Sequence, residues 1–159
     1  MAYIDKAEPQ EGCVFCELPA KGVCEETLVL HRGELVFVVL NRFPYVSGHL
    51  MVIPYSHAGR PDLLLPEEWT GIMDVARTAV RALETVYRPQ GFNLGMNVGR
   101  AAGAGIDEHL HMHVIPRWNG DTNFVPVLSD TRVIPEALPD TWHRLRPFFE
   151  DMEKQGANR

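Results

Sequence analysis

Hydrophobic and β-branched residues fall into several short runs along the 159-residue chain. Residues 27–32 and 34–41 flank Gly33 and predict a β-hairpin, and residues 49–55 predict a third strand. Alternation of apolar with other side chains predicts a fourth strand over residues 92–99. The alternating apolar residues of that run are Phe92, Leu94, Met96 and Val98.

One longer run, over residues 69–86, has apolar positions at the three- and four-residue spacing of a helix. We expect this helix to begin near Pro66, because proline suits the first helical position and the acidic residues that follow favour the positive end of the helix dipole. A closing helix is predicted over residues 141–153, interrupted by Pro147.

Strands, one long helix and further strands follow one another in that order. This order predicts an α+β fold in which a mostly antiparallel sheet carries the helix on one face. The chain shows no internal repeat and no linker, so we expect one domain spanning residues 1–159.

Composition limits the classes of function. The net charge is −6 and no run of lysine or arginine occurs, which argues against a protein that coats nucleic acid. No apolar stretch approaches the roughly 20 residues of a membrane helix, and the N-terminal residues do not resemble a secretion signal. We expect a cytoplasmic protein without a disulfide framework, since the 3 cysteines are odd in number.

Three histidines at every second position form the most unusual pattern in the sequence, "EHLHMHVIPRW". Alternate side chains of a strand share one face, so we expect these histidines to line a face that opens on a cleft. The histidines are His109, His111 and His113, and the residues expected on the opposite, core-facing side are Leu110, Met112 and Val114.

Three interpretations of the histidine row compete. The first is a chance arrangement of surface histidines on an amphipathic strand. The second is a metal site, because neutral imidazole is a good zinc ligand. The third is nucleophilic catalysis, in which one imidazole attacks an electrophilic phosphorus or carbonyl carbon while its neighbours handle protons.

Several segments together resemble one family. "HLHMHVI" at 109–115 matches the alternating signature of the histidine triad (HIT) superfamily of nucleotidyl hydrolases and transferases. "LNRFPYVSGHLMVIPYSH" at 40–57 and "GMNVGRAAGAG" at 95–105 are similar to two further blocks of that family. "VIPRWNGDTNF" at 114–124 resembles the branch related to diadenosine tetraphosphate hydrolases and phosphorylases. The resemblance covers roughly 12–125 and leaves 126–159 as a C-terminal extension.

The resemblance implies a HIT-like fold, with an antiparallel five-stranded sheet, one long helix and a C-terminal helix, usually paired as a homodimer. It implies a small-molecule nucleotide substrate, no organic cofactor, and hydrolysis of dinucleoside polyphosphates or related adenine nucleotides at the α-phosphorus. In this mechanism His111 is the nucleophile that forms a nucleotidyl-histidine, His113 contacts the phosphate and helps to protonate the leaving oxygen, and His49 borders the triad.

The resemblance also implies nucleotide-binding positions. Asn41 falls where the family binds ribose hydroxyls, although a plain turn asparagine is the simpler alternative. Asn97 matches a residue that bonds the phosphate region, and the loop containing Gly105 offers approachable backbone N–H groups. Phe15 is either part of a base pocket or a core residue. Trp118 either stacks on a second adenine or caps a hydrophobic edge.

Cys13 and Cys16 form a C-x-x-C pair that has three readings: buried small residues, a redox pair, or half of a zinc site. Some family members complete such a site with a histidine after the third strand and the first triad histidine, and this chain has both. The resemblance therefore implies a structural zinc held by Cys13, Cys16, His57 and His109, while Cys24 has only a packing role.

The type of reaction depends on the loop before the triad. Phosphorylases of the superfamily tend to carry a Gly-Ser pair where this chain has Ala104 and Gly105. The missing serine favours hydrolysis, with diadenosine tetraphosphate phosphorylase as the alternative enzyme. A zinc-stabilised nucleotide-binding regulatory module is the alternative outside the enzymes.

Overall fold

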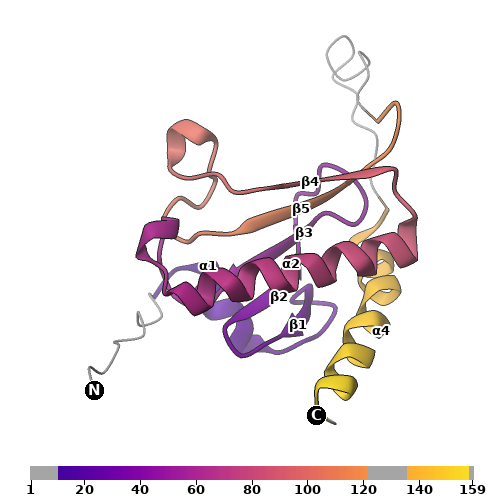
Figure 1. Cartoon of the computed structure of the whole chain (residues 1–159), viewed down its shortest axis with the longest axis horizontal. Helices are drawn as coiled ribbons and strands as arrows, with labels where there is room; N and C mark the ends of the chain where they lie inside the picture. The colour runs from indigo at the N-terminus through magenta and orange to yellow at the C-terminus, as the bar shows by residue number, and fades with distance from the viewer. Residues whose placement is uncertain (1–10, 122–135, 158–159) are drawn as a thin grey trace.

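The computed structural model describes residues 11–121 and 136–157, and its central feature is one antiparallel sheet (Figure 1). The strands lie in the order β1-β2-β3-β5-β4, and each pairs with its neighbours in antiparallel fashion. The strands are β1 (Val29–Arg32), β2 (Val36–Leu40), β3 (Leu50–Pro54), β4 (Gly91–Gly95) and β5 (Met112–Arg117). The predicted α+β fold with a five-stranded antiparallel sheet is confirmed, including the hairpin and the third strand.

Two long helices pack on this sheet, as predicted. They are α2 (Pro66–Tyr87), which crosses one face, and α4 (Leu138–Ala157), which lies beside β1 (Figure 1). Short helical turns join the elements: α1 (Val14–Glu17), η1 (Leu18–Lys21), η2 (Pro61–Leu63) and η3 (Arg100–Ala102). No helix within the described segments combines the length and apolarity that crossing a bilayer would require.

Three details differ from the predictions. Strand β5 begins at Met112, so His109 and His111 precede the strand. The fourth strand, predicted over residues 92–99, ends at Gly95, and Leu94 of this edge strand is 44% exposed. Helix α4 continues past Pro147, and Leu145 and Phe149, both 0% exposed, pack into the core on either side of the proline. The predicted segment after residue 121 lies outside the described residues up to 135.

The strand register places one row of side chains across the sheet. Val39 of β2 lies opposite Met51 of β3, and Met51 lies opposite His113 of β5. Because side chains alternate along a strand, this row faces away from the core side, where Met112 and Val114 are buried. The predicted division between histidine and apolar faces is therefore correct for the residues within β5.

Helix α2 is held close to the sheet by small residues. Its buried stripe includes alanines at 76, 79 and 82, all 0% exposed, which let the helix backbone approach the strands. The loop before β3 also touches this helix at Gly48, which has φ +79°, and a Cβ there would lie 2.8 Å from a methyl of Leu83. Both the backbone conformation and the contact require glycine.

The first turn of α2 also organises the loop after β3. The Leu65 N–H donates to Oε2 of buried Glu68 at 2.9 Å, which satisfies one of the free donors at the helix start. The Ser56 hydroxyl donates to the other oxygen of the same carboxylate. Glu68 therefore ties the helix start to the residue next to His57.

Candidate active site and metal centre

A cavity of about 790 Å³ opens on the sheet face that carries the Val39, Met51 and His113 row. This volume is within the usual range for small-molecule sites. Six residues predicted to take part in catalysis or nucleotide binding line it: Phe15, Asn41, Asn97, Gly105, His111 and His113. The structure thus brings together segments that are far apart in the sequence.

The hydrogen bond made by the His111 ring shows which of its two nitrogens carries the hydrogen. Its Nδ1 lies 2.9 Å from the backbone carbonyl oxygen of His109, and because that oxygen can only accept, Nδ1 carries the hydrogen. A neutral ring then has an unprotonated Nε2, which has no hydrogen-bond partner within residues 11–121 and 136–157. His111 thus presents a nitrogen lone pair at the cavity.

His113 has the opposite arrangement, which originates at His49. The Tyr45 N–H lies 3.3 Å from Nδ1 of His49 and donates to it, so His49 carries its hydrogen on Nε2. That Nε2 lies 2.9 Å from Nδ1 of His113 and donates to it. His113 must therefore carry its own hydrogen on Nε2. One lone pair and one N–H donor meet at the cavity, on two rings whose centroids are 4.9 Å apart.

Burial keeps these imidazoles neutral. Desolvation, followed by the charge of neighbouring histidines, lowers the pKa of His49 and of His113 to about 4. Desolvation also lowers the pKa of His111. At neutral pH the group therefore consists of neutral rings, which is the state in which an imidazole nitrogen can attack an electrophile.

Asn41 and Asn97 are held differently. The amide oxygen of Asn41 accepts from the Phe43 N–H at 3.0 Å, while its nitrogen lies 3.5 Å from the His49 ring. Asn97 donates to the Gly103 carbonyl oxygen at 3.4 Å, which bridges the two ends of the small-residue loop. Asn41 thus forms an asparagine turn, as in its simpler interpretation, and also lines the cavity.

His109 belongs to a second cluster behind the cavity. One nitrogen or sulfur atom of each of Cys13, Cys16, His57 and His109 lies within 4.8 Å of the others. The Nδ1 of His109 is 3.4 Å from the sulfur of Cys13 and 3.5 Å from that of Cys16. The sulfur of Cys16 is 3.4 Å from Nδ1 of His57.

These distances fit a tetrahedral metal site. With ordinary zinc–sulfur and zinc–nitrogen bond lengths, ligand atoms of a tetrahedron are about 3.5 Å apart. His109 is 0% exposed, and its Nε2 donates to the Pro54 carbonyl oxygen at 2.9 Å, so the lone pair of Nδ1 points toward the thiols. A backbone partner of this kind is what orients metal-binding histidines.

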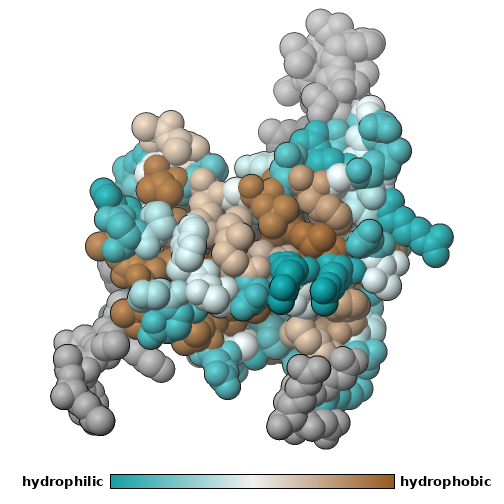
Figure 2. All heavy atoms as spheres, viewed as in Figure 1, coloured by the Kyte–Doolittle hydropathy of each residue, from teal (hydrophilic) through white to brown (hydrophobic). Residues whose placement is uncertain are grey.

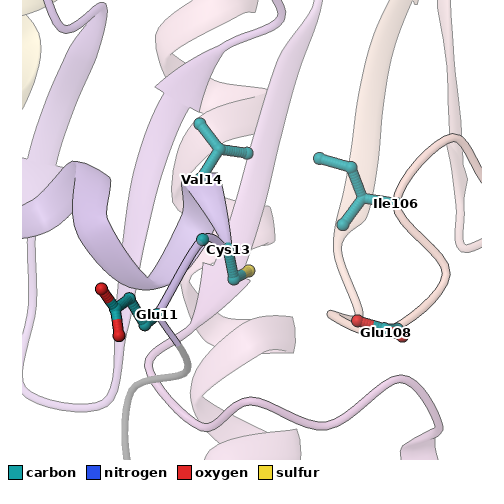
Figure 3. A pocket seen from close by; sticks show the side chains of 6 residues that line it. Glu11, Cys13, Val14, Ile106 and Glu108 are labelled. Carbon is teal, nitrogen blue, oxygen red and sulfur yellow. The ribbon is translucent and has the colours of Figure 1, made fainter.

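A smaller cavity of about 290 Å³ lies beside this cluster. Figure 3 shows Cys13 and Val14 on one side of it, with Ile106 and Glu108 on the other. Val14 and Ile106 also line the larger cavity. The two apolar side chains therefore lie where the smaller cavity adjoins the candidate nucleotide pocket.

The structure does not bring every predicted residue to the pocket. Trp118 follows β5 at the end remote from the triad and is not among the residues that line the cavity. Arg100 and Arg117 also do not line the cavity, and they form ion pairs with Asp107 and Asp121.

Several residues that line the cavity were not predicted from the sequence, and the most exposed of them are Phe43 and Tyr45 in the loop between β2 and β3. Their signal was available, because aromatic residues in a loop rich in turn formers have no core to fill.

Comparisons with known proteins agree with this geometry. Residues 23–120 match the model of the HIT domain family. The chain is 46% identical over 127 residues to the AP-4-A phosphorylase of Mycobacterium tuberculosis (strain ATCC 25618 / H37Rv), an alignment that covers 80% of this chain and 65% of the relative. The chain thus spans slightly less than two thirds of that protein.

Two further similarities are more distant. The chain is 32% identical to the bis(5'-nucleosyl)-tetraphosphatase [asymmetrical] of Schizosaccharomyces pombe, over 58% of this chain and 50% of that protein. Among solved structures, a zinc-bound histidine triad family protein from Mycobacterium smegmatis superposes with a TM-score of 0.70 and 27% identity, covering 91% of this chain and 97% of the other.

The low pKa values predict a pH dependence of stability. An unfolded histidine titrates near 6.5, whereas His49 and His113 have pKa values of about 4 in the folded protein. Between these values the unfolded chain binds more protons, so stability falls as pH falls from about 7 to about 4, by at most about 1.4 kcal/mol per pH unit for each histidine. We expect His113→Asn to make the free energy of unfolding, measured in urea, less dependent on pH over this range.

His143→Asn is the matched control, because His143 lies on the surface of α4 and pairs with Glu25 away from the cavity. The free energy of unfolding of this variant should depend on pH as steeply as that of the native protein. A His113→Asn slope equal to the native one would contradict the assignment of neutral, desolvated imidazoles.

Proposed function

The chain belongs to the HIT domain family, and from this premise we propose that it is a nucleotidyl hydrolase cleaving dinucleoside polyphosphates, or related adenine nucleotides, at the α-phosphorus. The observation that carries the proposal is the pair of oppositely protonated imidazoles at one cavity, His111 with a free Nε2 lone pair and His113 with an Nε2–H. A pocket that only binds a ligand does not need such a pair.

The proposed reaction has two steps. Nε2 of His111 attacks the α-phosphorus and forms a P–N bond, while the P–O bond to the leaving polyphosphate breaks. The Nε2–H of His113 hydrogen-bonds the leaving oxygen and stabilises the negative charge that develops on it. Water then attacks the phosphorus of the nucleotidyl-histidine, the P–N bond breaks and its electron pair returns to Nε2 of His111. The nucleoside monophosphate leaves, and the proton lost by the attacking water passes to solvent. Two easier displacements thus replace one difficult one.

The remaining pocket residues have binding roles in this proposal. Phe15 lies with its ring centroid 5.2 Å from that of His111 and gives the base an apolar wall, supported by its place in the buried core cluster. Asn41 binds the ribose hydroxyls, and Asn97 and the backbone at Gly105 bind the phosphate. Each of these residues lines the same cavity as His111.

The product pattern tests the nucleophile. Incubation with diadenosine tetraphosphate should yield AMP and ATP, and His111→Asn should reduce this rate by at least about a thousandfold, because removal of a covalent catalyst leaves only binding and positioning. Products are resolved by ion-exchange chromatography. Undiminished turnover in His111→Asn would refute the nucleophile, and no turnover of any nucleotide by the native protein would favour the nucleotide-binding regulatory module.

Phosphorolysis is the second candidate, and the 46% identity to an AP-4-A phosphorylase favours it. With inorganic phosphate as acceptor, diadenosine tetraphosphate would give one ADP and one ATP, so that ADP replaces the AMP of hydrolysis. The pocket lacks a hydroxyl at Gly105, where a Cβ would meet no atom within 4 Å and φ is not in the left-handed region. Serine therefore fits this position without strain.

Gly105→Ser should increase the ADP share of the products in phosphate buffer by several-fold, because the new hydroxyl can hydrogen-bond an incoming phosphate. Gly105→Ala is the matched control, since it fills the same space without a hydroxyl, and its product ratio should stay at the native value. Predominant ADP formation by the native protein would overturn hydrolysis in favour of phosphorolysis.

We also propose a structural zinc held by Cys13, Cys16, His57 and His109, supported by the tetrahedral spacing of their ligand atoms. Four protein ligands leave no open position, so the metal's contribution is to hold these segments together. Holding the side chain of His109 also fixes its backbone carbonyl, which accepts a hydrogen bond from Nδ1 of His111 and so orients that ring.

Elemental analysis of protein purified without added metal should find about one zinc per chain. Cys16→Ser should lose most of this zinc, whereas Cys24→Ser should keep it, because Cys24 bonds to Thr27 away from the cluster. Less than about a tenth of an equivalent in folded native protein, or equal loss in both variants, would contradict the site.

A homodimer is the assembly we propose, through the edge strand β4 and helix α2. Figure 2 shows hydrophobic side chains gathered between α2 and the outer edge of the sheet. An exposed apolar surface beside an open sheet edge favours pairing with another copy. The exposed residues are Trp69, Met73, Leu94 and Val98, each 40–44% exposed.

A further inference from the structure

Two aromatic side chains project from the mouth of the candidate nucleotide pocket. Phe43 is 80% exposed and Tyr45 is 67% exposed, the two largest exposed fractions among the large hydrophobic residues that the structure describes. Both line the same cavity as His111 and His113. Apolar area left in water beside a binding cavity indicates a surface that a ligand covers.

The backbone beneath these rings is fixed. The Phe43 N–H donates to the side-chain oxygen of Asn41 at 3.0 Å, and the Tyr45 N–H donates to Nδ1 of His49 at 3.3 Å. Because these hydrogen bonds already order the loop, its backbone loses little conformational entropy when a ligand binds and covers the two rings.

The rings lie on the side of the cavity from which the leaving group departs. Across the cavity, His111 has Phe15 at 5.2 Å and His113 at 4.9 Å between ring centroids. Tyr45 lies beyond His113, at 6.5 Å and 29° between planes. Because His113 hydrogen-bonds the leaving oxygen in the proposed reaction, it marks the leaving side. Tyr45 lies next to His113, in the loop that also carries Phe43.

A cation accompanies the two rings. Arg42 stands between Asn41 and Phe43 in the sequence and lines the same cavity. A guanidinium at this place suits the phosphate chain that joins the attacked phosphorus to whatever lies over the rings. The successive ring contacts thus run from the apolar wall at Phe15 through the nucleophile and the hydrogen-bond donor to the aromatic ring of Tyr45.

We propose that Phe43 and Tyr45 form a stacking subsite for the base of the leaving nucleotide, so that the protein selects substrates with a nucleoside at both ends. This inference rests on the proposed nucleotidyl transfer at His111. Stacking on aromatic faces tolerates any base, so the subsite favours dinucleotides over single nucleotides without specifying the second base. In this proposal Phe43 and Tyr45 stack on the second base, which is the role that the sequence had suggested for Trp118.

Two substrates with the same number of phosphates test the subsite. Diadenosine tetraphosphate and adenosine 5′-tetraphosphate present the same α-phosphorus to His111 and differ only in the second nucleoside. The measured quantity is the ratio of their kcat/KM values. We expect Phe43→Ala to lower this ratio between about fivefold and about a hundredfold, the range measured for loss of one base–aromatic stack.

Two further variants control the experiment. Phe43→Leu keeps apolar bulk without a π face and should give an intermediate ratio. Leu63→Ala removes a side chain that is 64% exposed but does not line the cavity, and its ratio should equal the native one. Folding of each variant is checked by its thermal unfolding midpoint.

The outcomes separate this inference from the function on which it rests. If the native protein turns over both substrates and Phe43→Ala leaves the ratio unchanged, the stacking subsite is overturned while the nucleotidyl hydrolase stands. The subsite is also overturned if Phe43→Ala slows both substrates equally. If the native protein attacks neither substrate, the proposed function itself fails.

Discussion

The hydrogen bond between Nε2 of His109 and the carbonyl oxygen of Pro54 is the interaction on which both halves of the site depend. It turns Nδ1 of His109 toward the two thiols and fixes the backbone of the same residue. The carbonyl of His109 in turn accepts from Nδ1 of His111 and leaves Nε2 of that ring unprotonated. One residue thus joins the Cys/His cluster through its side chain and sets the tautomer of the proposed nucleophile through its backbone.

The alternation of apolar residues, their helical spacing and the positions of the prolines were enough to predict the order of strands and helices along the chain. This is because the period of the hydrophobic residues reflects which face of an element is buried. They placed His113 and Met112 on opposite faces correctly. They could not show that the strand begins only at Met112, since the preceding histidines are held by partners distant in sequence. Pro54, which holds His109, is 55 positions away from it.

For the site, too, the sequence predicted the identities of many residues, whereas only the fold shows how their surroundings set their states. The family motifs pointed to the histidines, the asparagines and the cysteines, and the structure gathers them into one cavity and one adjoining cluster. Protonation states were beyond the sequence, because each depends on a backbone group that only the fold supplies, such as the Tyr45 N–H for His49. For Phe43 the sequence offered an aromatic residue in a loop, which indicates a binding surface, but not the cavity that this residue borders.

The central claim is that three neighbouring imidazoles are held in different tautomers by their surroundings, and ¹⁵N NMR of the histidine rings at neutral pH measures this directly. Long-range ¹H–¹⁵N correlations should show hydrogen on Nδ1 of His111 and on Nε2 of His109 and His113. Rings that remain neutral below pH 6 would agree with the lowered pKa values of His49 and His113. Hydrogen on Nε2 of His111, or an exchanging mixture of its tautomers, would contradict the account.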